Sequence, residues 1–224
     1  FFLSIPSGSA LTLDAPATYV DSSYTFYVFN GWTYDGSCSP DPSDSSILRC
    51  TVGDSDFTAT AHYTQILSIA KELVSCSYVG DGGSCDPDNL PLNTLVSFHM
   101  KITFHAYAPV TDVKVKDGIG ADLALNSPTW FTHVGGSDPT SAKAGRGKNK
   151  MGATLVTWTI GDVSDPFPIQ YALDLYVHTG LNPKDKQEYT QTGTHYLNSG
   201  PEVYFTYNEV EYMLQGPSVF VIVV

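Results

Sequence analysis

The sequence contains few basic residues. Only 11 Lys and Arg stand against 23 Asp and Glu, so the formal net charge is −12. Binding to nucleic-acid phosphates depends on clustered cations, and a nucleic-acid partner is therefore not expected. Long apolar runs are also missing. The longest, Val219-Phe220-Val221-Ile222-Val223-Val224, is far shorter than the roughly 20 residues of a membrane-spanning helix, so membrane insertion is not expected either.

The motifs of common catalytic and cofactor sites are absent. The sequence contains no H-E-x-x-H, G-x-S-x-G, P-loop or G-x-G-x-x-G element, and no EF-hand loop. His and Cys residues do not occur at the spacing of a metal finger. We therefore expect no enzymatic activity, no cofactor and no metal. A signal peptide is not recognisable, and we interpret the chain as already processed or as part of a longer protein.

Cysteine is scarce, and its four residues form two local pairs, Cys38 with Cys50 and Cys76 with Cys85. The even number of cysteines, the short separation within each pair and the low lysine content predict two disulfides and an oxidising compartment. The expected location is therefore extracellular or at the cell surface. The alternative is four free, buried thiols in a cytosolic protein.

Helical periodicity is nearly absent, whereas apolar and polar residues alternate along several segments. The clearest segment is 96–105, in which one face carries only apolar residues: Val96, Phe98, Met100, Ile102 and Phe104. Such alternation is typical of a strand with one side on a core and one in water. Turn residues such as Asp117-Gly118 and Asn182-Pro183 separate these segments. The pattern predicts an all-β protein with a β-sandwich.

One alternating pattern closes at Phe57–Tyr63 and another opens at Ile66–Lys71, which places a domain boundary near Gln65. We predict a small β domain over 1–65 and a larger β-sandwich over 66–224. Residues 135–152, rich in Gly and Lys, are predicted to form a long mobile loop.

The first domain contains the aromatic segment Tyr24–Trp32 with its Gly-Trp turn, the Cys38 and Cys50 pair, and the closing segment Thr58–Tyr63. These features give it a resemblance to the divergent internalin-type B repeat of bacterial surface proteins. The resemblance implies a very small β domain in which Trp32 fills the core and the disulfide compensates for the limited buried area.

Three segments of the second domain form a recognisable series: Asn93–Thr103, Val110–Asp117 and Thr157–Asp162. Through them the domain resembles the β-sandwich repeats of prokaryotic surface proteins, which overlap with fimbrial isopeptide-forming domains. The order and spacing of the three segments match the family. The resemblance implies an immunoglobulin-like sandwich.

In such domains a lysine on the first strand can bond covalently to an asparagine near a late strand, assisted by a buried acid. Lys71 matches the lysine, Asn198 the asparagine and Asp117 the acid, with Asp174 as the fallback acid. Burial disfavours the ammonium form and so frees the amine for attack. The alternative is that Lys71 lies on the surface and that Asn198 and Asp117 are turn residues.

These features predict a structural subunit of an extracellular microbial fibre, pilus-like filament or surface layer. The partner would be other copies of the same chain, joined head to tail by strand addition. The expected donor is the apolar strand 219–224, which Gly216-Pro217 precedes; Phe1, Phe2, Leu3 and Ile5 form the alternative donor. The C-terminal strand can instead belong to its own sandwich. Two other functions remain open: an adhesin that binds a glycan or host ligand, and accessory domains of a larger secreted protein.

Overall fold

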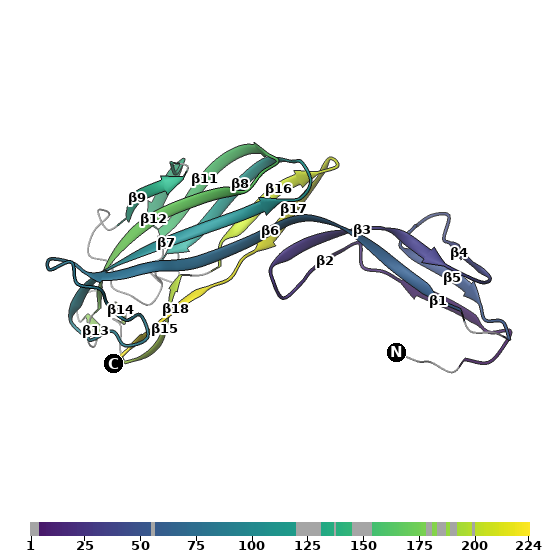
Figure 1. Cartoon of the computed structure of the whole chain (residues 1–224), viewed down its shortest axis with the longest axis horizontal. Coiled ribbons are helices and arrows are strands. Elements are labelled where there is room, and N and C mark those ends of the chain that lie inside the picture. The colour runs from purple at the N-terminus through teal and green to yellow at the C-terminus, as the bar shows by residue number, and fades with distance from the viewer. Residues whose placement is uncertain are drawn as a thin grey trace. The chain divides into compact units, whose positions relative to one another are not determined.

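The computed structural model describes residues 5–54, 57–119, 131–136, 138–144, 154–177, 181–182, 187–188, 192–198 and 200–224. All regular secondary structure in these residues is β-strand (Figure 1), which confirms the predicted all-β class. The strands are β1 Ala10–Asp14, β2 Thr18–Val20, β3 Thr25–Tyr34, β4 Cys38–Pro40, β5 Ile47–Thr51, β6 Ala59–Tyr78, β7 Thr94–Ala106, β8 Val110–Ile119, β9 Phe131–Gly136, β10 Ser141–Ala144, β11 Thr154–Val163, β12 Phe167–Val177, β13 Leu181–Asn182, β14 Gln187–Glu188, β15 Gly193–Asn198, β16 Glu202–Tyr207, β17 Val210–Gln215 and β18 Val219–Val223.

The chain divides into two compact units, Phe1–Leu67 and Ser68–Val224. The division lies close to Gln65, where the sequence predicts a boundary. In unit 1, β5 lies between β1 and β4, and β3 pairs with both β2 and β6. Strand β6 is continuous through the division, so the predicted boundary falls inside a strand and not in a linker.

Unit 2 contains two sheets of mainly antiparallel strands. One continues from β6 through β7 and β12 to β9; the other has the order β10-β11-β8-β15-β18, with β16 and β17 attached beside β8. The predicted apolar face of 96–105 is confirmed, because every apolar residue of that face is fully buried. The second sheet contributes its own buried residues: Val113, Val115, Val156, Trp158, Val203 and Phe205. The two apolar faces form the core of a β-sandwich.

The last four strands form a long hairpin with a break in each arm. Strand β15 is followed by Gly200-Pro201 before β16, and β17 is followed by Gly216-Pro217 before β18. The two glycines lie against each other: the N–H of Gly216 donates to the Pro201 carbonyl at 2.7 Å. A Cβ on Gly200 would overlap the carbonyl oxygen of Gly216, so this close approach of the two arms requires glycine.

The predicted mobile loop at 135–152 is partly wrong. Its first residues complete β9, and Ser141–Ala144 forms β10, which pairs in register with Thr154–Thr157 of β11. Residues 137 and 145–153 lie outside the described part of the chain. The strand was missed because Ser-Ala-Lys-Ala has no apolar alternation. Its pairing is made by main-chain hydrogen bonds to β11, the next strand along the chain.

Three turns of unit 1 are closed by aspartate carboxylates. Asp21 accepts from the backbone N–H groups of Ser23 and Thr25, Asp41 accepts from the N–H and hydroxyl of Ser43, and Asp44 accepts from those of Ser46. Arg49 also donates to Asp41. These bonds favour the ionised carboxylates, so the pKa values of all three aspartates lie below their usual range. Much of the acidity of unit 1 is therefore turn chemistry.

Unit 1 is expected to lose stability in acid. The three carboxylates have lower pKa values in the folded than in the unfolded state, so their contribution is complete above the unfolded value of about 4 and is lost as the pH falls through the folded values. Urea unfolding followed by circular dichroism should show a decreasing midpoint from about pH 5 to about pH 2. Asp41→Asn keeps an acceptor oxygen but does not titrate, so its decrease should be smaller. Equal pH dependence in both proteins would contradict this role of Asp41.

Candidate functional site

Lys71 is a buried lysine of unit 2. It lies on β6, where Ile69 and Lys71 are buried while Ala70 and Glu72 are exposed. The strand alternation therefore directs the Lys71 side chain into the sandwich. Lysine is rarely buried unless it has a partner. Lys71 therefore points inward, as the resemblance implies, and the alternative that it lies on the surface is wrong.

Asp117 is the partner of Lys71. On β8, Val113, Val115 and Asp117 are buried and alternate with Lys114 and Lys116, so Asp117 also points into the sandwich. The Nζ atom of Lys71 lies 2.8 Å from both carboxylate oxygens of Asp117, and neither side chain is accessible to solvent. Strands β6 and β8 belong to different sheets, so this ion pair joins the two layers of the sandwich.

Burial changes the acid–base behaviour of the Lys71 amine. Desolvation of the ammonium lowers its pKa from 10.5 to about 8, although the neighbouring Asp117 charge and hydrogen bond act in the opposite direction. A buried lysine of this kind has a far larger neutral fraction near neutral pH than a surface lysine has. The neutral amine is the nucleophilic form.

The main chain of Asn198 lies beside β8, the strand that carries Asp117. Asn198 ends β15, and it pairs with Ile119 of β8 on one side and with Val219 of β18 on the other. Ile119 is two residues from Asp117 along β8. Contacts of the Asn198 side chain lie outside the described part of the structure, and its role remains a prediction.

Asp174, the fallback acid, lies on β12 opposite Ser97 of β7. Its side chain is likewise outside the described part. The structure brings Asp117, and not a turn residue, to the Lys71 amine, and this contact favours Asp117 as the acid. Asp117 is a strand residue and not a turn residue, because it pairs with Val156 in the ladder between β8 and β11.

The Lys71–Asp117 pair can exchange one proton between an amine and a carboxylate that are both removed from water. In one form it is an ammonium–carboxylate pair, and in the other a neutral amine beside a carboxylic acid. The second form combines a nucleophile with a proton donor, which is the combination that attack on an amide requires. No group of three or more His, Cys, Asp or Glu suited to a metal ion occurs among the described residues.

Comparison with known proteins gives little further evidence. No protein-family model and no curated protein matches the sequence. Among solved structures, a protein described as membrane-anchored from Corynebacterium diphtheriae aligns over 96% of this chain, with 10% identity and a TM-score of 0.41. This chain spans 55% of the length of that protein. Likeness at this level carries no argument about function, and the resemblances to internalin-type and isopeptide-forming domains stay predictions.

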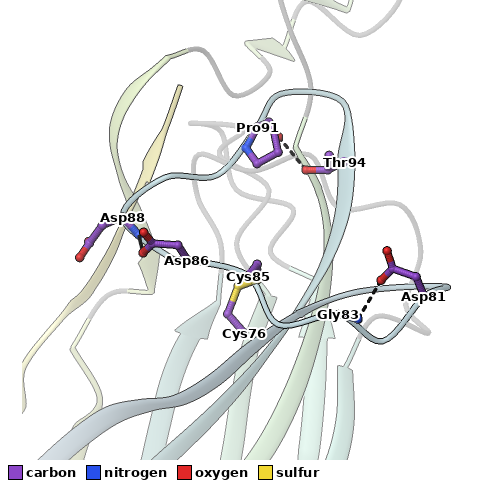
Figure 2. Close-up of a disulfide and its surroundings, with 8 residues drawn as sticks. All are labelled: Cys76, Asp81, Gly83, Cys85, Asp86, Asp88, Pro91 and Thr94. Carbon is purple, nitrogen blue, oxygen red and sulfur yellow. Dashed lines mark hydrogen bonds between the residues drawn. A yellow bond between two sulfur atoms is a disulfide. The ribbon is translucent and has the colours of Figure 1, made fainter.

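Both predicted disulfides are present. Cys38 on β4 pairs with Cys50 on β5, and Cys76 near the end of β6 pairs with Cys85. The second one closes a turn in which Asp81 accepts from the N–H of Gly83 (Figure 2). No helix long and apolar enough to cross a bilayer occurs in the described residues.

The C-terminal strand 219–224 lies in its own sandwich. Strand β18 pairs with β15, from Gly193↔Val223 to Asn198↔Val219. Val221 and Val223 are buried, whereas Phe220, Ile222 and Val224 are 46%, 36% and 55% exposed. One face of this strand therefore lies in the core, and the other is exposed. Whether the strand is exchanged between copies remains a prediction.

The alternative donor at the N-terminus falls mostly outside the described residues. Phe1, Phe2 and Leu3 are not described, and Ile5 is half-buried. The segment Pro87–Leu90, which lies along β18, was not predicted from the sequence. Its Asp-Pro-Asp-Asn neighbourhood indicates a turn, but no signal in the sequence connects it with the C-terminal strand.

Proposed function

We propose that this chain is a structural module of an extracellular surface structure, such as a fibre or pilus-like filament, and that it assembles head to tail by exchange of β18. The observation that supports this most directly is the construction of the C-terminal strand. It is an edge strand that follows a Gly-Pro break, and its place in the sandwich is defined by a main-chain ladder and by two buried valines.

These features suit a strand that can be received from another copy. Gly216-Pro217 separates β18 from β17, so a change at these residues would redirect the strand without disrupting β17. The receiving site would be the same in both arrangements: the ladder of β15 and the cavity filled by Val221 and Val223. A contact of this kind is heterologous, and it generates open filaments unless the rotation closes a ring.

The second part of the proposal is a covalent bond between Lys71 and Asn198. The neutral Lys71 amine attacks the side-chain carbonyl carbon of Asn198. Asp117 transfers a proton to the departing amide nitrogen and takes up the proton that the attacking amine loses, and ammonia leaves. One carbon–nitrogen bond forms and one breaks, with no oxidant or reductant. The buried pair of Lys71 and Asp117 at 2.8 Å supports this chemistry. A crosslink between the first and a late strand suits a protein that bears tension.

Negative-stain microscopy of the purified chain, concentrated under oxidising conditions, tests the assembly. Wild-type filaments whose growth is blocked by a peptide with the sequence of residues 217–224 would support the proposal. A wild-type protein that remains monomeric at all concentrations, and native material without filaments, would contradict it.

A second candidate function is ligand binding by unit 1, and an aromatic cluster favours it. The rings of Tyr19 and Tyr27 are stacked 4.5 Å apart, Tyr63 meets Tyr19 edge-on, and Phe29 lies against Tyr63. Tyr19 is 39% exposed. Partly exposed aromatic rings are common in glycan and protein contacts. A glycan array on which the wild type binds and Tyr19→Ala does not would favour an adhesin.

A further inference from the structure

The outer edge of β18 is covered by a short segment of the same chain, Pro87–Leu90, called here the covering segment. The N–H of Ile222 donates to the Pro87 carbonyl at 2.8 Å, the N–H of Leu90 donates to the Ile222 carbonyl at 2.8 Å, and the N–H of Val224 donates to the Leu90 carbonyl at 2.9 Å. Leu90 forms a parallel bridge with Val223 and is fully buried. The covering segment therefore occupies the position of an additional strand beside β18.

The covering segment is tied to the rest of unit 2 by a disulfide directly before it. Cys85 is bonded to Cys76 on β6, and its N–H also donates to the Cys76 carbonyl at 3.0 Å. From Cys85 the chain runs through a turn in which Asp86 accepts from the N–H of Asp88 (Figure 2). Between the disulfide and the first contact with β18 there is only one residue, so the disulfide restricts where the covering segment can go.

Without the covering segment, β18 would present an open edge. The unpaired groups would be the N–H and C=O of Ile222 and the N–H of Val224, next to the exposed side chains Phe220, Ile222 and Val224. An apolar strand with an open edge is a template for pairing with another chain. Leu90 already pairs with this edge in parallel orientation, and a strand of a second copy would supply main-chain pairing of the same kind.

We propose that the outer edge of β18 is a docking edge for an extended strand of a second copy of this chain, and that the Cys76–Cys85 disulfide keeps the covering segment on it in the monomer. This inference deepens the proposed assembly and rests on it, because it names the contact that has to open before β18 can leave or accept a strand. The disulfide then determines how readily copies associate.

Hydrogen exchange of the β18 amides tests the covering contact, and the strand contains its own control. The amides of Ile222 and Val224 point to the covering segment, and by strand alternation those of Val221 and Val223 point to β15. In the double variant Cys76→Ser/Cys85→Ser, protection of the Ile222 and Val224 amides should fall about tenfold or more, with Val221 and Val223 little changed. Cys38→Ser/Cys50→Ser, the matched control in unit 1, should change none of the four. Unchanged protection of Ile222 and Val224 would overturn the role of the disulfide.

Light scattering after size-exclusion chromatography tests the docking edge. The Cys76→Ser/Cys85→Ser protein should associate at concentrations at which the wild type is monomeric. Adding Ile222→Pro removes the outward N–H from the edge and should restore the monomer. A double variant that loses amide protection yet stays monomeric would overturn the docking edge while keeping the covering contact. Filaments of the wild type that are insensitive to Ile222→Pro would leave the proposed function standing and reject this edge as its route.

Discussion

The denatured, disulfide-bonded chain is expected to have an intact mass lower than its sequence mass by one ammonia, in addition to the four hydrogens lost in forming the two disulfides. The loss of ammonia follows from the bond between the Lys71 amine and the Asn198 side chain. The reason for expecting it is the burial of Lys71 against Asp117, since both side chains are inaccessible to water and their polar atoms lie 2.8 Å apart. Mass spectrometry of a tryptic digest should recover a branched peptide that joins the two residues.

Three variants give the mass result its specificity. Lys71→Ala and Asn198→Ala remove the two reacting groups, and Asp117→Ala removes the acid. Each variant should have the mass of its own sequence less only the hydrogens lost in the two disulfides. Lys101→Ala is a suitable control, because Lys101 on β7 forms a half-exposed ion pair with Glu72 and takes no part in the bond. An intact wild-type mass without the ammonia loss would reject the bond. If only Asp174→Ala abolished it, the acid assignment to Asp117 would be wrong.

The crosslink should also be visible in stability. It closes a loop of more than a hundred residues, which by chain entropy corresponds to about 5 kcal/mol of unfolding free energy. Asn198→Ala should therefore lower the unfolding free energy by roughly this amount. Denaturant unfolding measures the change as a lower midpoint concentration than that of the wild type. Asp117→Ala should be affected at least as strongly, since it also leaves a buried ammonium without its partner.

Deletion of residues 217–224 is expected to unfold unit 2 in the monomeric chain. The deletion removes Val221 and Val223 from the core, uncovers Leu90, and leaves β15 and the covering segment without their hydrogen-bond partners. Two buried valines at roughly 1.5–3 kcal/mol each, together with the lost main-chain bonds, give about 5 kcal/mol or more. This loss is comparable with the stability of an ordinary domain. Near-ultraviolet circular dichroism and urea unfolding measure it.

A synthetic peptide with the sequence of residues 217–224 should restore the fold of the truncated chain in trans. Rescue of this kind is the simplest demonstration that the receiving site accepts a strand from another molecule. A scrambled peptide of the same composition is the control. A truncated chain that stays folded and monomeric without any peptide would contradict the place of β18 in the core, and failure of the matched peptide to bind would argue against exchange.

The all-β class and the inward face of β7 followed from local alternation alone. Residues 96–104 repeat their apolar face with period two, and a sheet buries one such face whatever its neighbours are. The two disulfides were also accessible from the sequence, because each cysteine pair is close enough in the chain to leave few other partners. The burial of Lys71 was indicated only by its match to the first-strand lysine of isopeptide-forming domains. A lysine in a strand is otherwise expected to lie on the surface.

Local sequence therefore determined the all-β class, which face of β7 is buried and which cysteines pair. Only the tertiary structure decided that Lys71 and Asp117, 46 residues apart, share one buried ion pair, and that Pro87–Leu90 lies on the edge of β18. The physical reason is that the main-chain hydrogen bonds of an edge are the same for every residue type. Which segment covers β18 is therefore not encoded in side-chain pattern; it depends on where the disulfide and the strand order place the chain.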